Sequence, residues 1–374
     1  MTQLPAWFEL IPDKLSVKVY KHDIQTLKGI VPCWSYITDG LWAFQQKELI
    51  FTLRRSDLDE LVASPDAPAQ GSQNLHQYIF AFFLEVYRFA EQGQLVYEGD
   101  CSWFGSQGFL GSSNWAAVVY IRPQQFEGIE ASSPLLAVIL LTAEEFEVYQ
   151  NFGLTRILSH LGRAYVYYPC PSWSERSRPS LISMREMQGS LLGRMPSIWV
   201  RGGGVRAYHE AKPKSIQQSP QPGQYLQQQI VQWSDNKAQI TLRLLPHAGE
   251  ELRRQLAQCP RDAVVAVQTA LDPTANACLV WQAGQSNSFA ITPPDSDGSR
   301  LGGCFIAFAP QQASDRGKIV EDGFVILLTD ASWIAFEAAL ESGSSIFIPA
   351  TDEGANFILE WIPSESEKSD KTFF

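Results

Sequence analysis

Apolar residues recur every three to four positions from Gln73 to Gln92, and this spacing predicts an amphipathic helix with one buried stripe. Gly93 follows as the residue type that commonly ends a helix in the left-handed conformation. Shorter alternating or wholly apolar stretches predict strands, which in the first half of the chain are Leu15–Tyr20, Glu48–Leu53, Ala116–Ile121 and Leu135–Leu141.

The run Leu135–Leu141 is apolar throughout, which favours a central strand covered on both faces. Thr142 and Glu145 follow it at the spacing of a capping box. We therefore expect a helix that starts there, breaks at Gly153 and stops at Gly162.

The second half of the chain alternates in the same way. Its predicted strands are Tyr225–Trp233, Ala238–Leu245, Ala263–Gln268, Ala277–Gln282, Cys304–Ala309, Phe324–Leu328 and Phe357–Trp361. Helices are expected at Ala248–Gln258 and Ser332–Glu341, the second with Asp330 as its N-cap and Gly343 as its stop. These elements predict an α/β protein of two mixed-sheet domains with packed helices.

Residues 209–224 are rich in Pro, Gln and Ser and almost free of large apolar side chains, which is typical of a linker. We therefore expect a first α/β domain over residues 1–200, a linker over 201–224, a second α+β domain over 225–363 and a polar tail over 364–374.

Composition adds limits to this outline. The 374 residues are 45% hydrophobic, enough for a packed core, and the net charge of −11 disfavours a general nucleic-acid binder. The longest purely apolar run, seven residues, is far short of a membrane span, so we expect no membrane insertion. The six cysteines form no close pairs, so we expect no zinc or other metal site and a reducing, cytoplasmic location.

Charge is unevenly distributed. Residues 156–214 contain ten basic and three acidic residues, whereas residues 319–370 contain eleven acidic residues and one lysine. Either the two segments neutralise one another, or the basic segment recruits an acidic or phosphorylated partner through arginine forks. The sequence leaves both open.

A stretch with two prolines, a tryptophan and two arginines is the most distinctive candidate for a protein-binding surface. The prolines stiffen the backbone, which would preorganise the aromatic and cationic groups. Its candidate contact residues are Tyr168, Pro169, Cys170, Pro171, Trp173, Arg176 and Arg178. The alternative is a strand-exit loop that packs over the seam between the two expected domains.

Motifs for catalysis are absent: there is no nucleophile elbow, phosphate-binding loop or histidine pair at zinc-ligand spacing. We therefore expect a non-enzymatic protein without a cofactor. A hydrolase or carbohydrate-binding protein that uses Trp34, Trp42 and Trp103 is a more distant alternative.

The stretch from Tyr168 to Arg178 resembles the C-terminal region of the FYVE-finger endosomal proteins Smad anchor for receptor activation and endofin. Ile319–Gly323, Thr38–Gly40 and Phe109–Ser112 look like further matching blocks, in the same order. Their family-like residues, which we expect to be structural, are Gly40, Gly111, Glu321, Asp322 and Gly323. The first half also resembles the suppressor-of-fused fold.

These resemblances imply an adaptor-like or scaffold-like interaction domain. Suppressor-of-fused relatives in bacteria imply, as an alternative, an immunity protein that masks a toxin. Nothing in this sequence matches the cysteine-rich FYVE finger itself, so its zinc, lipid and endosomal properties are not implied.

Overall fold

A computed structural model describes most of the chain and divides it into two compact units. Unit 1 comprises Met1–Phe146 and Pro171–Ser180, and unit 2 comprises Glu147–Cys170 and Leu181–Phe374. The residues whose structure is described are 5–26, 28–55, 70–105, 108–110, 112, 114–122, 129, 133–175, 178–209, 214–215, 229–232, 236, 238–272, 274–282, 284, 288–293, 296 and 298–363.

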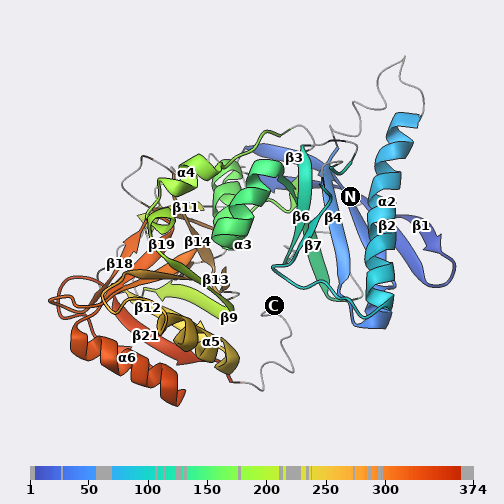
Figure 1. The fold of residues 1–374 in the computed structure, drawn as a ribbon. Helices are drawn as coiled ribbons and strands as arrows, with labels where there is room; N and C mark the ends of the chain where they lie inside the picture. Colours follow the sequence, from blue (N-terminus) through green and yellow to red (C-terminus); the bar gives the residue numbers. More distant parts are fainter. Residues whose placement is uncertain are drawn as a thin grey trace. The chain divides into compact units, whose positions relative to one another are not determined.

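Unit 1 is built on a mixed sheet with the strand order β1-β2-β3-β4-β7-β6-β5 (Figure 1). β4 runs parallel to β7 and to the short β8, and the other neighbours are antiparallel. Its elements are β1 (Ala6–Ile11), β2 (Leu15–Thr26), β3 (Gly29–Asp39), the 3-10 helix η1 (Leu41–Phe44), β4 (Glu48–Arg54), α2 (Gln70–Glu91), β5 (Cys101–Trp103), β6 (Trp115–Ile121), β7 (Leu135–Thr142) and β8 (Trp173–Ser174).

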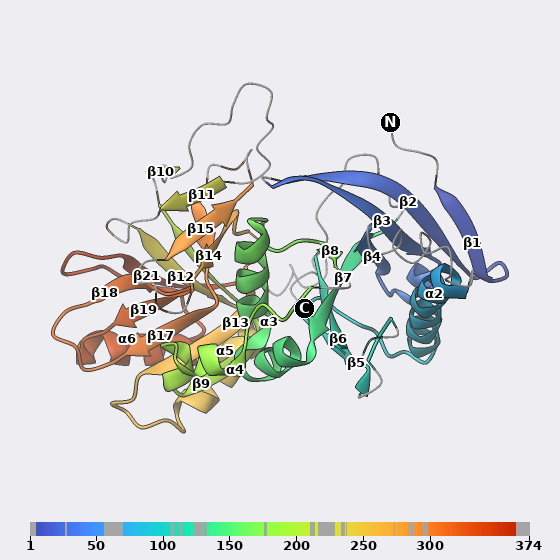
Figure 2. The same ribbon diagram turned by 90° about the horizontal axis from the view of Figure 1, so that it is seen from above.

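Helix α2 lies along one face of this sheet, as both ribbon views show (Figures 1 and 2). Its buried stripe, which includes Ile79 and Phe83, packs on inward-facing strand residues such as Val17, Phe51 and Val138. Removing this apolar surface from water is the main force that holds the helix on the sheet.

Unit 2 contains the larger sheet, with the order β10-β11-β15-β14-β16-β9-β13-β17-β19-β18 and with β12, β20 and β21 joined through β9. Its elements are α3 (Ala143–Tyr165, whose first four residues belong to unit 1), α4 (Met184–Gln188), η3 (Leu192–Arg194), β9 (Ser197–Tyr208), β10 (Lys214–Ser215), β11 (Gln229–Gln232), β12 (Gln239–Leu244), α5 (Pro246–Leu256), β13 (Val265–Leu271), β14 (Ala277–Val280), β15 (Phe289–Thr292), β16 (Arg300–Gly302), β17 (Phe305–Ala309), β18 (Arg316–Val320), β19 (Gly323–Leu327), α6 (Asp330–Ser342), β20 (Ile346–Ile348) and β21 (Asn356–Trp361).

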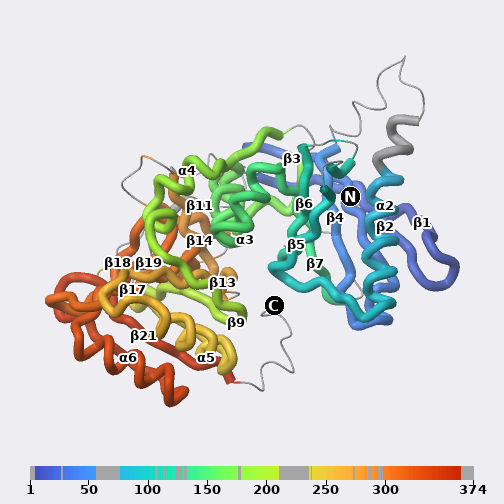
Figure 3. Tube along the Cα trace, in the orientation of Figure 1, coloured from blue at the N-terminus to red at the C-terminus, as the bar shows by residue number. Residues whose placement is uncertain are grey.

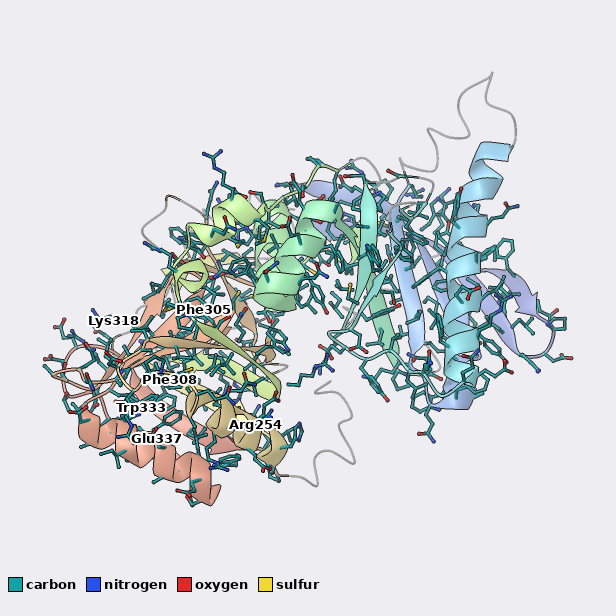
Figure 4. All side chains as sticks on the ribbon, in the orientation of Figure 1. Arg254, Phe305, Phe308, Lys318, Trp333 and Glu337 are labelled. Carbon is teal, nitrogen blue, oxygen red and sulfur yellow. The ribbon has the colours of Figure 1, made fainter. Side chains whose placement is uncertain are left out.

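The long strand β9 organises unit 2. Its start pairs in parallel with β13, and its end, after the left-handed Gly202, pairs antiparallel with β12 and β16. Helices α5 and α6 run next to each other (Figure 3). Trp333 of α6, which is partly buried, packs against the hydrophobic core of unit 2 and contacts Phe308 of β17, with ring centroids 6.4 Å apart (Figure 4).

Helix α3 begins and breaks where the sequence predicts. Thr142 and Glu145 form the reciprocal capping box, with Thr142 N donating to Glu145 Oε2 at 3.0 Å. The break falls at Gly153, whose φ of 77° and close approach to Trp199 exclude a side chain. The helix does not stop at Gly162, however, but continues to Tyr165.

The predicted fold class is confirmed, because both units are mixed sheets with packed helices. The helix α2 and its left-handed stop at Gly93 are also as expected. The N-cap of α6 differs: it is Thr329, whose side chain accepts from Ser332 N, and Asp330 is the first helical residue.

The boundary between the units differs from the predicted linker at 201–224. The first part of that segment is the end of β9, which is held in unit 2 by pairing with β12 and β16. Much of the rest, residues 210–213 and 216–224, lies outside the described residues, as does the predicted tail 364–374. The chain instead passes between units near residues 146, 170 and 180.

Candidate functional site

The stretch predicted as a contact surface is divided between the two units. Tyr168, Pro169 and Cys170 belong to unit 2, where Tyr168 Oη donates to the carbonyl oxygen of Ala275 at 2.7 Å. Cys170 has no exposed surface. Arg176 lies outside the described residues.

The remaining part of that stretch is buried in unit 1. Trp173 is only 3% exposed and, with Ser174, forms β8 beside the end of β4. Pro171 is buried as well. The tryptophan therefore lies in the interior, and its role as a surface anchor stays a prediction without a geometric basis in this structure.

Arg178 also points inward. Its guanidinium forms a two-pronged ion pair with Glu145, at 2.5 and 2.7 Å, and donates to the carbonyl oxygen of Leu140 at 3.0 Å. The guanidinium carbon lies 5.1 Å from the centroid of the Trp115 ring. Arg178 thus ties the end of β7 and the first turn of α3 to the residues after β8, which is a structural use of an arginine fork.

The family-like residues in unit 1 form a turn around a buried carboxylate. Glu48 accepts from Thr38 Oγ1 at 2.6 Å, from Gly40 N at 3.0 Å and from Trp42 N at 2.9 Å. Gly40 has a φ of 136°, and a Cβ there would lie 2.0 Å from Lys14 O. The turn therefore requires glycine. Gly111 lies outside the described residues.

The family-like residues in unit 2 surround a buried ion pair. Asp322 lies 2.9 Å from Arg156 of α3, and neither side chain has exposed surface. Next to it, Glu321 accepts from the backbone N of Leu191. A Cβ on Gly323 would lie 2.4 Å from the Phe305 ring.

Further titratable groups lie around that ion pair, and burial keeps them uncharged. Burial lowers the pKa of His160 to about 4 and raises the pKa of Cys278 to about 12. The pKa of Cys304 is also raised by burial. Protonated thiols are poor nucleophiles, and burial shields all three side chains from a substrate, so this cluster has the chemistry of a structural core.

A serine–histidine contact occurs in unit 1 that no sequence motif signals. His22 Nε2 lies 2.8 Å from Ser35 Oγ, which lies 2.6 Å from Thr52 Oγ1. The three residues lie on adjacent strands, and Ser35 has no exposed surface. Burial lowers the pKa of His22 to about 4. The contact therefore links strands and is closed to a substrate.

The tryptophans considered for a sugar-binding site lie on different elements. Trp42, in η1, is 49% exposed, and Trp103, in β5, is 66% exposed and stacks on Phe146. Trp34, in β3, is half-buried beneath Lys21. Within the part of the chain that the structure describes, no ring contact joins these three tryptophans. Among the described residues, no group of three metal-ligating side chains gathers at one place.

The outer strand of unit 1, β1, is exposed along most of its length. β1 pairs with β2 on one side and is the last strand of the sheet order. Trp7 and Phe8 are 59% and 41% exposed and, as neighbours in a strand, lie on opposite faces. Lys18 Nζ lies 4.5 Å from the Trp7 ring centroid and 2.8 Å from Asp39. Phe8 contacts Phe80 of α2.

No family model matches the chain. A stretch of 154 residues, 40% of the chain, is 30% identical to the human "Zinc finger FYVE domain-containing protein 9" and spans 10% of that protein. The chain is thus similar to a FYVE-domain protein over a small part of that protein's length.

Among solved structures, the chain is similar to Drosophila Suppressor of Fused, with 11% identity, a TM-score of 0.32 and coverage of 93% of this chain and 89% of that one. A TM-score of 0.32 carries no conclusion about function. No helix in the described part of the chain combines the length and apolarity needed to cross a bilayer.

Proposed function

We propose that this protein is a non-enzymatic protein-binding module that receives an extended segment of another protein along β1. The observation that carries the proposal is the outer edge of this strand, which pairs with no other strand among the described residues, together with two exposed aromatic side chains on its opposite faces. The similarity to part of a FYVE-domain protein supports the finer proposal of an adaptor-like role.

Strand addition explains why these features occur together. The outer edge of a terminal strand presents unpaired N–H and C=O groups, which an extended segment satisfies. Trp7 and Phe8 supply one aromatic contact on each face of the lengthened sheet. Aromatic side chains of this kind dominate binding energy at interfaces.

The occupant is a different protein rather than a second copy of this chain. Each copy carries a net charge of −11, so two copies repel each other before any contact forms. The β1–β2 hairpin itself has Glu9, Asp13 and Asp23 balanced by Lys14, Lys18 and Lys21. We expect a segment with apolar side chains at two adjacent positions, one on each face of the lengthened sheet, which meet Trp7 and Phe8.

The experiment selects short random peptides displayed on phage against the whole protein. Binding of a selected peptide is then measured by fluorescence anisotropy. The double variant Trp7→Lys/Phe8→Lys should bind at least about tenfold more weakly, because it removes both aromatic contacts and adds edge lysines. The matched control is Ile334→Lys/Phe347→Lys, which changes two exposed apolar residues of unit 2.

Equal binding by the two double variants would overturn the proposal, provided that circular dichroism shows both to be folded. A stable dimer in sedimentation experiments that the Trp7→Lys/Phe8→Lys change dissociates would also overturn it, because the occupant would then be a second copy.

A further inference from the structure

Four neighbouring strands of unit 2 bring arginines, a glutamate and an exposed tyrosine onto one face of the sheet. Arg206 and Tyr208 are two residues apart on β9 and therefore point to the same side. Arg243 of β12 pairs in register with Glu360 of β21, and Arg300 of β16 pairs with Tyr208. Tyr208 is 38% exposed.

The glutamate lies between two guanidinium groups. Its Oε2 atom is 3.2 Å from Nη2 of Arg206 and 3.4 Å from Nε of Arg243. The second contact is too poorly aligned to be a hydrogen bond, and Arg243 Nε has no hydrogen-bond partner among the described residues. Glu360 thus contacts both arginines through a single oxygen atom, at distances of 3.2 and 3.4 Å.

The second carboxylate of the cluster is already occupied. Asp272, whose side chain is fully buried, accepts from Thr274 N at 2.8 Å and from Thr274 Oγ1 at 2.6 Å. Its distances to Arg243 Nη1 are 3.4 Å. Asp272 is therefore anchored locally, whereas the side chain of Glu360 is 40% exposed.

The cluster has more positive than negative charge, since Arg206, Arg243 and Arg300 face Asp272 and Glu360. Burial lowers the pKa of Arg206, which means that its charge is only partly solvated. A multivalent anion gains more from two such guanidinium groups than a single carboxylate oxygen does. Nη2 of Arg206 and Nε of Arg243 can each donate to a different oxygen of the anion, while Nη1 of Arg206 stays bonded to Thr274 Oγ1 at 2.8 Å.

We propose that Arg206 and Arg243 form a binding site for a phosphate-type oxyanion, which takes the place of the Glu360 carboxylate. The exposed Tyr208 and Arg300 stand at the rim of this site. The site lies in unit 2, so it is independent of the strand-addition function assigned to β1 in unit 1.

The alternative is a network of ion pairs that only stabilises the sheet. The two accounts give opposite results for Glu360→Gln, which removes the competing charge and keeps the shape of the side chain. An anion site predicts tighter binding of phosphate by about tenfold, because one like charge is removed from the site. A purely structural network predicts lower stability and no binding of phosphate.

The test is isothermal titration of the whole protein with inorganic phosphate, compared with sodium chloride at equal ionic strength. We expect saturable binding that Glu360→Gln strengthens, Arg206→Gln/Arg243→Gln abolishes and Arg254→Gln leaves unchanged. Arg254 is an exposed arginine of α5 in the same unit (Figure 4). Arg300→Gln, at the exposed rim, should weaken binding and serves if the double variant does not fold.

Absence of saturable binding to the Glu360→Gln protein would overturn the proposal. So would equal weakening by Arg254→Gln and Arg300→Gln, since that would indicate a general effect of charge.

Discussion

Nη2 of Arg156 lies 2.9 Å from Oδ1 of Asp322, and the side chains of both residues have no exposed surface. The arginine belongs to α3, and the aspartate belongs to the turn between β18 and β19. The pair therefore fastens this helix to the sheet of unit 2. A buried ion pair adds little stability by comparison with an apolar pair, but loss of one partner leaves an uncompensated charge.

Asp322→Asn should lower the free energy of unfolding by about 3–5 kcal/mol, because Arg156 then remains buried without a counter-charge. The measurement is urea unfolding followed by circular dichroism. Asp352→Asn is the matched control: it breaks the exposed pair of Arg316 and Asp352, worth about 1 kcal/mol or less. Equal effects of the two substitutions would contradict the structural role of Asp322.

The corresponding substitution in unit 1 is Arg178→Met, which leaves the buried carboxylate of Glu145 unpaired. We expect a loss of about 3–5 kcal/mol in unfolding free energy, against less than about 1 kcal/mol for Arg88→Met at an exposed helix pair. Normal stability of the Arg178→Met protein would instead favour the surface role that the sequence suggests for this arginine.

Substitution of Gly40 tests the turn around Glu48, and substitution of Gly93, at the end of α2, is its control. Gly40→Ala places a methyl group 2.0 Å from Lys14 O at a φ of 136°, so we expect a loss of about 3 kcal/mol. Gly93→Ala, at a φ of 80° with open space around it, should cost about 1 kcal/mol. Chemical unfolding measures both, and a larger effect at Gly93 would refute the close approach at Gly40.

His160 makes stability depend on pH. Burial lowers its pKa to about 4, while nearby Asp322 raises it and Arg156 lowers it further. The unfolded chain, with a histidine pKa near 6.5, therefore takes up a proton first. The neutral, buried His160 therefore contributes about 3 kcal/mol to the free energy of unfolding above pH 6.5, and this contribution is lost as the pH falls to 4.

Replacing this histidine isolates its contribution. The variant His160→Gln should show a shallower fall in unfolding free energy between pH 6.5 and pH 4 than the unaltered protein. Parallel curves for the two proteins would show that His160 is not buried in its neutral form.

Local patterns predicted the elements whose signals lie within one segment. The stripe on α2, the capping box of Thr142 and Glu145 and the break at Gly153 depend on residues close in sequence, and each has its expected place. The position of the N-cap of α6 differs by one residue, because Thr329 and Asp330 are both good capping residues.

Features that depend on distant residues could not be predicted in this way. Arg178 is drawn inward by Glu145, which is 33 residues away in sequence. The sequence of β1 does not alternate cleanly between apolar and polar residues, since Trp7 and Phe8 are adjacent. It is a strand because it pairs with β2, which its own sequence does not indicate. The cluster of Arg206, Arg243 and Glu360 likewise depends on the register of β9, β12 and β21.

Amide hydrogen exchange of β1 in the presence of a selected peptide tests the central claim most directly. The account predicts that amides within Ala6–Ile11 exchange at least about tenfold more slowly in the complex, because the added strand pairs with the outer edge of β1. Unchanged exchange in β1, with protection appearing instead around Tyr168 to Arg178, would contradict it.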